Sequence, residues 1–403
     1  MRFNLPALVA TALLVPSIQA QQDPMIFIPK SHEQRWSMWG PQAHTNVQVY
    51  LGEPQFPSQE APLLAMSSFG ATGAGPSGFS PDKIRTAYGL PSEGGSRTIA
   101  IVDAYHFPSA LNDFNVFAMQ YGLPTEPSAT ATKSTNAVFR VVYASGSKPN
   151  VDSGWSQEAA LDIEWAHAMA PGAKIVLVEA ASSSLTDLAN AVRKANSIPG
   201  VSQVSMSWGA GEFPVETYFD SIFSASGVTY FASAGDRGGY AEFPSVSPKV
   251  ISVGGTTLQT DANGDVIAET AWGASGGGPS IFEPRPKFQA NAGFPGIKRA
   301  GPDVSFDANP VTGVAVFDST PCGGYSGWMV FGGTSVSAPC MAGICNLAGT
   351  FRASSAAQLT AMYGNLGSFK YRDVTAGTAG KFSAAPGWDY ITGVGTPVGL
   401  SGM

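Results

Sequence analysis

The sequence predicts an α/β fold in which helices cover a mostly parallel central sheet. After about residue 80, short apolar runs alternate with helix-like segments, as expected for parallel strands buried on both faces. The apolar runs are residues 98–102, 174–178, 201–208, 228–232 and 250–253. In such sheets, functional sites form at the carboxyl ends of the strands. The length of 403 residues suits one large α/β domain or two smaller ones.

Helical segments are expected between the strands. Ser80 is a suitable N-cap and Pro81 suits the first helical position, so a helix should begin there. Helix-like patterns follow at residues 108–121 and 184–195. After about residue 350 the chain is rich in glycine and is expected to form loops.

Composition excludes several classes of protein. Hydrophobic residues make up 44% of the chain and charged residues 13%, which is too apolar for a disordered protein. The net charge is −7, so the chain lacks the basic footprint of a nucleic-acid-binding protein. Three cysteines are too few for a disulfide-stapled scaffold, and at most one intramolecular disulfide can form among them. They are Cys322, Cys340 and Cys345.

The N-terminus has the pattern of a secretory signal peptide at residues 1–20. Arg2 precedes the apolar run 5–15, and the small residue Ala20 ends the segment. No later stretch reaches 18 clean apolar residues, so we expect a secreted protein without a membrane partner. Residues 21–79 are expected to be a weakly structured leader or linker that precedes a domain at 80–403.

Two carboxylates lie on one predicted helix, residues 155–169, whose apolar side chains lie all round it. Such a helix is buried. Glu158 and Asp162 are four residues apart and share one face, and two buried carboxyls are costly unless they are hydrogen-bonded or share a proton. Glu164 and His167 should point elsewhere. The alternative is a solvated acidic pair.

Two further segments could carry chemistry. Residues 331–339 place Ser335 after a Gly-Gly turn at the start of a helix, where backbone N–H groups can hold an oxyanion. The alternative is a structural turn with a serine cap. Asp236 follows the strand 228–232, although taken alone it is more typical of a turn. Of the histidines, only His106, with Asp103 close by, remains a candidate base for Ser335.

These motifs together resemble the sedolisins, the serine-carboxyl peptidases. The similarity covers roughly residues 80–397 and includes several motifs in the family's order. The motifs are Glu158-x-x-Leu161-Asp162, Ser233-Ala-Gly-Asp236, Phe243-Pro-Ser, Val253-Gly-Gly-Thr256, Trp272 with Ser275-Gly-Gly-Gly278, Pro302-Asp-Val-Ser305 and Gly333-Thr-Ser335-x-Ser-Ala-Pro339.

The resemblance implies a subtilisin-like three-layer fold and a secreted peptidase with an acidic optimum. It makes Ser335 the nucleophile, Glu158 the general base and acid, and Asp162 the carboxyl that orients Glu158. Asp236 becomes the oxyanion-hole residue, which can donate a hydrogen bond only when it is protonated. Asp103 is a further candidate for this network.

The same resemblance implies how substrates and a metal are bound. Residues Ser207, Trp208 and Gly209 look like an edge strand that pairs with extended peptides, so peptides or denatured proteins are the expected substrates of a monomeric enzyme. The tail resembles the family's calcium loop, with one structural Ca²⁺. By analogy its ligands are Asp373, Asp389 and the carbonyls of Val374, Ala385 and Gly387.

Several alternatives remain open. Residues 21–79 are short for the folded propeptide usual in this family, so they are either a reduced propeptide or a plain linker. A catalytically silent relative that acts as a binding protein is a second hypothesis. A non-peptidase hydrolase using Asp103 and His106 is a third, and it predicts a neutral optimum. The sequence does not separate an endopeptidase from a tripeptidyl-peptidase.

Overall fold

The computed structural model describes residues 25–37, 40–52, 76–294 and 296–403. Its main sheet has the strand order β14-β13-β11-β9-β6-β8-β7, and β17 pairs with β13. The strands pair in parallel except for β14, which is antiparallel to β13. This confirms the predicted α/β class. The bounds are β6 Thr98–Ala104, β7 Phe139–Tyr143, β8 Lys174–Ala180, β9 Val201–Met206, β11 Thr229–Ser233, β13 Ile251–Thr260, β14 Val266–Ala271 and β17 Val304–Asp307.

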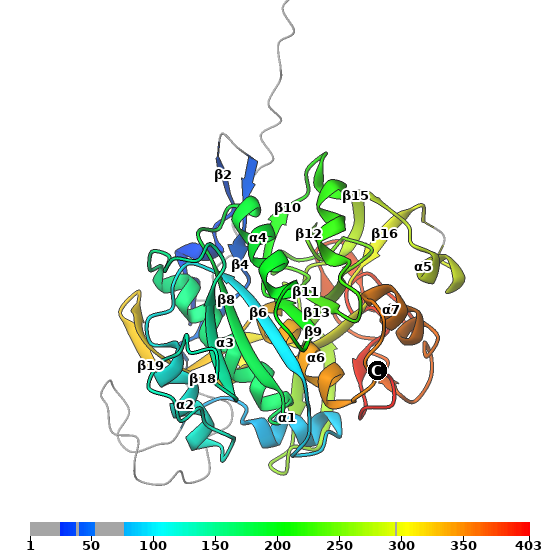
Figure 1. The fold of residues 1–403 in the computed structure, drawn as a ribbon. Coiled ribbons are helices and arrows are strands. Elements are labelled where there is room, and N and C mark those ends of the chain that lie inside the picture. The colour runs from blue at the N-terminus through cyan, green and yellow to red at the C-terminus, as the bar shows by residue number, and fades with distance from the viewer. Residues whose placement is uncertain (1–24, 38–39, 53–75, 295) are drawn as a thin grey trace, which may run out of the picture.

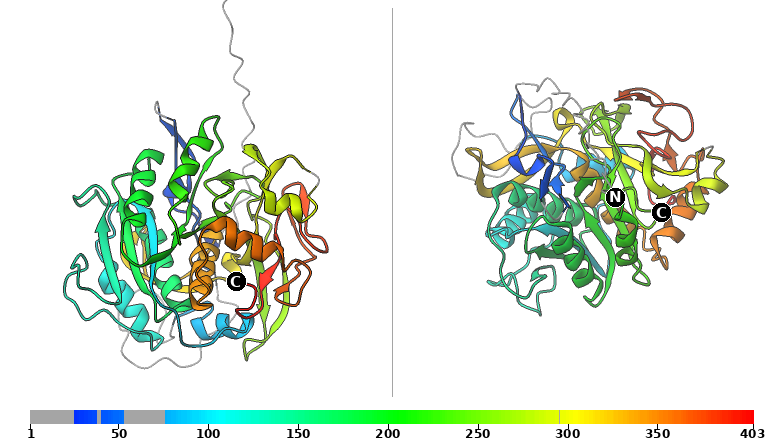
Figure 2. Two further views of the ribbon diagram at one scale, coloured as in Figure 1. Left: turned by 45° about the vertical axis from the view of Figure 1, so that its right-hand side comes forward. Right: turned by 90° about the horizontal axis from the view of Figure 1, so that it is seen from above.

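Helices pack on both faces of this sheet and give three layers (Figures 1 and 2). Alternate side chains of β6 point to opposite faces: Ile99 and Ile101 belong to one buried cluster, Ala100 and Val102 to the other. The first cluster contains α2, α3 and α6, and the second contains α4. The helices are α1 Pro81–Tyr88, α2 Ala110–Gln120, α3 Ser153–Met169, α4 Leu185–Asn196, α5 Lys287–Asn291, α6 Thr334–Leu347 and α7 Ser355–Tyr363.

The predicted helix starts agree with the structure. Ser80 caps α1 by accepting from the N–H of Lys83, with Pro81 in the first helical position, and Ser184 caps α4. The expectation of loops after residue 350 is wrong for α7, whose N-cap Ser354 and buried Leu359 and Met362 fix a short helix. No helix in the described residues is long and apolar enough to cross a membrane. The predicted signal peptide lies outside the described residues.

Smaller sheets and short helices flank the main sheet. The hairpin β18–β19 is extended by β5 and β1, and β10 lies between β12 and β4. Other pairs are β2–β3, β15–β16, β20–β23 and β21–β22. Their bounds, with those of the short 3₁₀ helices, are β1 Ile26–Phe27, η1 Lys30–His32, β2 Arg35–Ser37, β3 Gly40–Gln42, β4 His44–Thr45, β5 Gln48–Tyr50, β10 Trp208–Gly211, η2 Glu216–Phe223, β12 Glu242–Phe243, β15 Gly278–Pro284, β16 Lys298–Gly301, η3 Pro310–Thr312, β18 Val314–Cys322, β19 Tyr325–Gly332, β20 Tyr371–Arg372, β21 Thr378–Ala379, β22 Phe382–Ser383 and β23 Thr396–Pro397.

Two expectations about the chain's course need correction. The leader was expected to be weakly structured, but its described parts, 25–37 and 40–52, form strands that pack on the domain. The buried side chains of Ala43, Val47 and Val49 and pairing with β10 and β19 hold them there. The single strand expected at 201–208 is also wrong. It breaks at Ser207, where β10 leaves the main sheet to pair with β12 and β4.

Candidate active site

Helix α3 places Glu158 and Asp162 together inside the protein. Asp152 caps the helix by accepting from the N–H groups of Gly154 and Trp155. The side chains of Glu158 and Asp162 are fully buried, so they are not a solvated pair. Asp162 Oδ1 accepts a hydrogen bond from Ser207 Oγ at 2.8 Å. Asp162 therefore reaches the residue that precedes β10, the strand expected to bind substrate.

A third buried carboxyl, Asp103, completes this cluster at the carboxyl end of β6. Burial raises its pKa to about 8. Burial, and next the charge of Asp103, raise the pKa values of Glu158 and Asp162 well above the usual range. The nearby hydroxyl of Ser335 and the hydrogen bond from the N–H of Asn46 act in the opposite direction. Because three neighbouring buried carboxyls cannot all ionise, they keep protons at neutral pH.

Ser335 lies in the first turn of α6, directly after β19 and a tight glycine turn. Gly333 has φ +100, a left-handed conformation that favours glycine, and a Cβ there would collide with the carbonyl oxygen of Asn46. The Ser335 hydroxyl donates to the carbonyl oxygen of Ser207 at 3.4 Å and lies close enough to Glu158 to lower the pKa of that carboxyl. A serine hydroxyl beside a carboxylate is the arrangement that activates a nucleophile.

Asp236 follows β11 and reaches the start of α6. Its Oδ1 accepts from the N–H and the hydroxyl of Thr334, both at 2.8 Å. Asp236 is buried, and burial raises its pKa to about 8 despite those bonds. Its Oδ2 lies 2.6 Å from the position that a Cβ on Gly333 would take. At acidic pH the protonated carboxyl can therefore donate toward a carbonyl held over that glycine.

The predicted substrate strand is a free edge only in part, because β4 lies along it. Residues of β10 and β4 pair antiparallel as Trp208 with Thr45 and Gly209 with His44. The Trp208 side chain points into the core, where Nε1 donates to the carbonyl of Val102 at 2.9 Å. Trp208 can therefore meet a peptide only through its main chain.

Sequence reasoning missed two residues that reach the centre of the site, Asn46 and Gln48. The N–H of Ser335 donates to the carbonyl of Asn46 at 3.3 Å, and the N–H of Asn46 donates to Glu158 Oε2 at 3.1 Å. Gln48 Nε2 donates to Asp236 Oδ2 at 3.2 Å. The alternation of apolar Val47 and Val49 with polar neighbours was the available signal of a strand.

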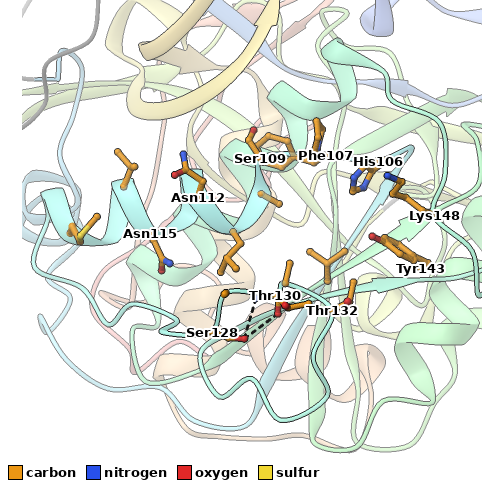
Figure 3. Close-up of a pocket in the computed structure, with 18 residues that line it drawn as sticks. His106, Phe107, Ser109, Asn112, Asn115, Ser128, Thr130, Thr132, Tyr143 and Lys148 are labelled. Carbon is orange, nitrogen blue, oxygen red and sulfur yellow. Dashed lines mark hydrogen bonds between the residues drawn. The ribbon is translucent and has the colours of Figure 1, made fainter.

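The histidine alternative is not supported by the geometry. His106 Nδ1 lies 2.8 Å from Glu179 Oε2, and its ring contacts Tyr143 edge-on. With Lys148 it lines a separate cavity of about 680 Å³ beside α2 (Figure 3). His167, as expected, points elsewhere: its Nε2 contacts the carbonyl of Pro124 at 2.8 Å. Glu164 also faces away, accepting from the N–H of Phe317.

The predicted calcium ligands come together in the C-terminal loops. Asp373 Oδ2 accepts from the N–H of Gly387 at 2.9 Å, and Asp389 Oδ2 accepts from the N–H of Ala385 at 3.1 Å. Thr392 Oγ1 lies within 3.5 Å of the carbonyl of Val374. Two carboxylates near main-chain carbonyls form a donor set of hard oxygen atoms that fits Ca²⁺. No cluster of three or more His, Cys, Asp or Glu side chains suited to a metal occurs in the described residues.

The cysteines are not paired. Cys322, Cys340 and Cys345 are all free and buried in the structure. The one intramolecular disulfide that three cysteines allow is therefore absent among the described residues. Burial raises the pKa of each thiol, so these side chains behave as small hydrophobic groups.

Comparisons with known proteins agree with this geometry. The model of the subtilase family matches residues 144–395. Kumamolisin from Bacillus sp. (strain MN-32) is 31% identical over 374 residues, 81% of this chain and 63% of that protein. Sedolisin from Pseudomonas sp. (strain 101) is 28% identical over 366 residues, 79% of this chain and 60% of that protein. The chain thus spans about three fifths of the length of these relatives.

A solved structure gives the same result. It is that of Pseudomonas sedolisin, a serine-carboxyl proteinase, complexed with two molecules of pseudo-iodotyrostatin. The TM-score is 0.67 with 26% sequence identity, and the match covers 80% of this chain and 96% of the other. By fold, by the subtilase match over most of the domain and by these relatives, the chain belongs to the subtilase family and, within it, to the sedolisins.

Proposed function

We propose that this chain is a serine-carboxyl peptidase that acts in acid. One observation carries the proposal: the main chain of Asn46 lies in the site as an extended peptide would. Its carbonyl oxygen accepts from the N–H of Ser335 and lies over Gly333, while its own N–H donates to Glu158 Oε2 at 3.1 Å. The similar solved structure, described as a serine-carboxyl proteinase, supports the same chemistry.

The roles of the side chains follow from their contacts. Ser335 Oγ attacks the carbonyl carbon and gives its proton to Glu158, which later passes that proton to the leaving amine. The oxyanion is held by the N–H of Ser335 and by protonated Asp236. Asp162 is a supporting carboxyl. It accepts a hydrogen bond from Ser207 Oγ, and the charge of Glu158 raises its pKa.

The electrostatics support action in acid. Asp236 donates only while it is protonated, so activity should fall as the pH rises through about 8. The lower pH limit of activity is set by Glu158, which must be ionised in order to accept a proton. Burial is the largest cause of its raised pKa, and that burial includes cover by Asn46. An open cleft would admit water and bring the pKa of Glu158 down toward the acidic range.

The described part of the leader supports a second proposal, that it holds the enzyme inactive. Residues 44–48 pair with the edge of β10. They also accept the hydrogen bond of the oxyanion-hole N–H of Ser335 and donate one to an oxygen of Asp236. A substrate cannot bind there until they leave. Residues 21–79 would then be a reduced propeptide rather than a plain linker.

The same segment favours an endopeptidase. A tripeptidyl-peptidase needs the cleft closed beyond the third residue before the cleaved bond. Here the chain continues past that point: the N–H of Ala43 donates to the carbonyl of Ser183 at 2.9 Å, and Gln42 bridges to Ser184. The cleft therefore accepts a chain on both sides of Asn46.

Calcium binding and secretion complete the proposal. Asp373, Asp389 and the carbonyls of Val374, Ala385 and Gly387 would hold one Ca²⁺, which would stabilise the C-terminal loops through its charge. Residues 1–20 would direct the chain out of the cell and be removed. Mass spectrometry of protein recovered from the culture medium would test secretion by showing whether those residues are missing.

The central test is hydrolysis of a denatured protein from about pH 2.5 to about pH 8, after incubation of the chain in acid. We expect activity in the acidic range, none with Ser335→Ala, and a loss of about 10²–10⁴-fold with Glu158→Gln. A His106→Gln variant is the matched control and should keep its activity. A neutral optimum that depends on His106 would contradict the proposal. A folded protein inactive at every pH would instead indicate a silent binding relative.

A further inference from the structure

The cavity of about 680 Å³ beside α2 lies apart from the candidate active site (Figure 3). Its walls come from residues 106–119, from the loop at 128–132, and from β7 with the loop that follows it. None of Ser335, Glu158 and Asp236 lines it. Its volume falls within the range of cavities that hold small molecules, about 300–1,000 Å³.

The loop wall of the cavity is held by hydrogen bonds to its own neighbours. Asn136 Nδ2 donates to the carbonyl of Thr130 at 3.0 Å and to that of Ala131 at 3.3 Å. The carbonyl of Ala131 also accepts from the N–H of Val141 in β7 at 2.9 Å. The wall is therefore formed before any ligand arrives, and a ligand does not bear the cost of ordering this loop.

The helix wall offers an apolar surface. Four residues of α2 that line the cavity are spaced i, i+3, i+4 and i+7 and so lie on one face of the helix: Asn112, Asn115, Val116 and Met119. The amide of Asn115 is already engaged by the main chain of Glu126, as donor at 2.9 Å and as acceptor at 2.8 Å. Met119 is 65% exposed. This face therefore leaves Val116 and Met119 to contact an apolar part of a ligand.

Basic side chains gather at one end of the cavity. Figure 3 shows His106 and Lys148 there, beside Tyr143. Lys148 has no ion-pair partner in the described part of the chain. Among the described residues that line the cavity, none is an aspartate or a glutamate. This end therefore favours an anionic group over a cationic one.

A buried carboxyl behind His106 fixes the orientation of its ring. His106 Nδ1 lies 2.8 Å from Glu179 Oε2, and the N–H of Phe107 donates to Glu179 Oε1 at 3.1 Å. The side chain of Glu179 is 1% exposed and that of His106 12%. Nδ1 is thus engaged by Glu179, and Nε2 is the ring nitrogen left for a ligand.

The charge of this end depends on pH. Burial is the largest cause that raises the pKa of Glu179 to about 8, and the charge of Asp103 acts in the same direction. The pair of Glu179 and His106 therefore holds one proton at neutral pH and has no net charge. Burial, and next the charge of Lys148, lower the pKa of His106, so the second proton is taken up only in acid. The imidazolium then donates through Nε2–H beside the ammonium of Lys148.

We propose that this cavity binds, in acid, a small molecule whose carboxylate is carried on an apolar body. His106 Nε2–H and the ammonium of Lys148 would hold the carboxylate through charge-assisted hydrogen bonds, and Val116 and Met119 would cover the apolar part. A free organic acid and the C-terminus of an apolar peptide share this chemistry. Binding here does not depend on the peptidase proposal, because the cavity contains none of the groups that carry that reaction.

Calorimetric titration of the full chain carrying Ser335→Ala measures binding without hydrolysis of a probe. The probes are hexanesulfonate, which stays ionised in acid, and hexanoate, which becomes protonated. We expect the Kd of hexanesulfonate to fall by about ten-fold or more between about pH 8 and about pH 4. Hexanoate should bind best at an intermediate pH, because in stronger acid it loses its own charge. Uncharged hexanamide should bind about ten-fold more weakly than hexanesulfonate in acid.

Two variants locate the binding site. Lys148→Gln should raise the Kd of hexanesulfonate by about ten-fold, whereas the matched control Lys194→Gln, an exposed lysine on α4, should bind as the parent protein does. His106→Gln keeps a side chain that can bond to Glu179 but does not titrate, so the Kd should no longer depend on pH. If His106→Gln does not fold, Lys148→Gln and its control decide.

A leucine tripeptide with a free C-terminus and its C-terminal amide distinguish the two sources of the carboxylate. The inference holds if either the tripeptide or hexanoate binds, and the tighter of the two identifies the source. It is overturned if hexanesulfonate shows no saturable binding below about 10 mM, or if its Kd is the same at about pH 4 and about pH 8. An unchanged Kd in Lys148→Gln also overturns it. The peptidase proposal stands or falls separately, with the activity of the chain that retains Ser335.

Discussion

Replacing Asp236 tests whether a carboxyl group serves the oxyanion hole as a neutral acid. In the structure its Oδ1 is engaged by both donors of Thr334, so only Oδ2 faces the carbonyl over Gly333. In Asp236→Asn the amide oxygen can take the place of Oδ1 and the NH₂ group that of Oδ2. The variant keeps a donor at the required position, and this donor does not titrate.

The size of the effect follows from the loss of one oxyanion donor. Asp236→Ala removes it and should lower kcat by about 10²–10³-fold, which corresponds to about 2.7–4 kcal/mol. Asp236→Asn should stay within about ten-fold of wild type in acid. Since burial raises the pKa of Asp236 to about 8, the wild-type donor is lost as pH rises through that value. The Asn variant should not lose activity for that reason.

The assay is the initial rate of hydrolysis of an unfolded protein by acid-treated enzyme, with each variant compared across the pH range. Thermal melting in acid shows whether the substituted proteins are folded. The reasoning is refuted if folded Asp236→Asn is as inactive as Asp236→Ala at every pH. Asp236 would then act as an ionised carboxylate and not as a donor.

Three further outcomes are expected. Burial, and next the charge of His44, lower the pKa of His32 to about 3; acid therefore favours release of the leader, and His32→Gln should slow the appearance of activity after acidification. Burial raises the pKa of Asp318 to about 8, so its contribution to stability is lost as pH rises from about 4 to about 8. Asp318→Asn should raise the free energy of unfolding at neutral pH by about 1–3 kcal/mol and leave it unchanged in acid. Ca²⁺ should raise the Tm of wild type and of Asp261→Ala, a half-buried control outside the C-terminal loops, but not of Asp389→Ala, as measured by calorimetry.

Much of the fold was predictable because its signals are local. Apolar runs indicate β6, β8, β11 and β13 without reference to the rest of the chain. The cap at Ser80 depends on a few neighbouring residues. The shared face of Glu158 and Asp162 follows from helical spacing alone, and an all-round apolar helix already indicates that both are buried.

The rest of the site depends on contacts between residues far apart in sequence. Asn46 reaches Glu158 across 112 positions and Gln48 reaches Asp236 across 188. Their segment lies in a leader rich in Gln, Pro, Ser and Gly, whose composition resembles a linker, and its order comes from partners on β10 and β19. No local pattern marks the break at Ser207 either. The break arises because the chain leaves its partners β6 and β11 at the end of β9 and pairs with β4 and β12 in β10.

Residues 44–48, which occupy the site, also affect the pKa values of its carboxyl groups. Burial dominates the pKa of Glu158, and the bond from Asn46 only partly offsets it, so departure of residues 44–48 should lower that pKa on balance. The loss of the bond from Gln48 favours the protonated form of Asp236, whereas the entry of water opposes it. Opening the cleft would thus prepare the base to accept a proton. Removal of the leader is therefore expected to activate the chemistry as well as to clear the path of the substrate.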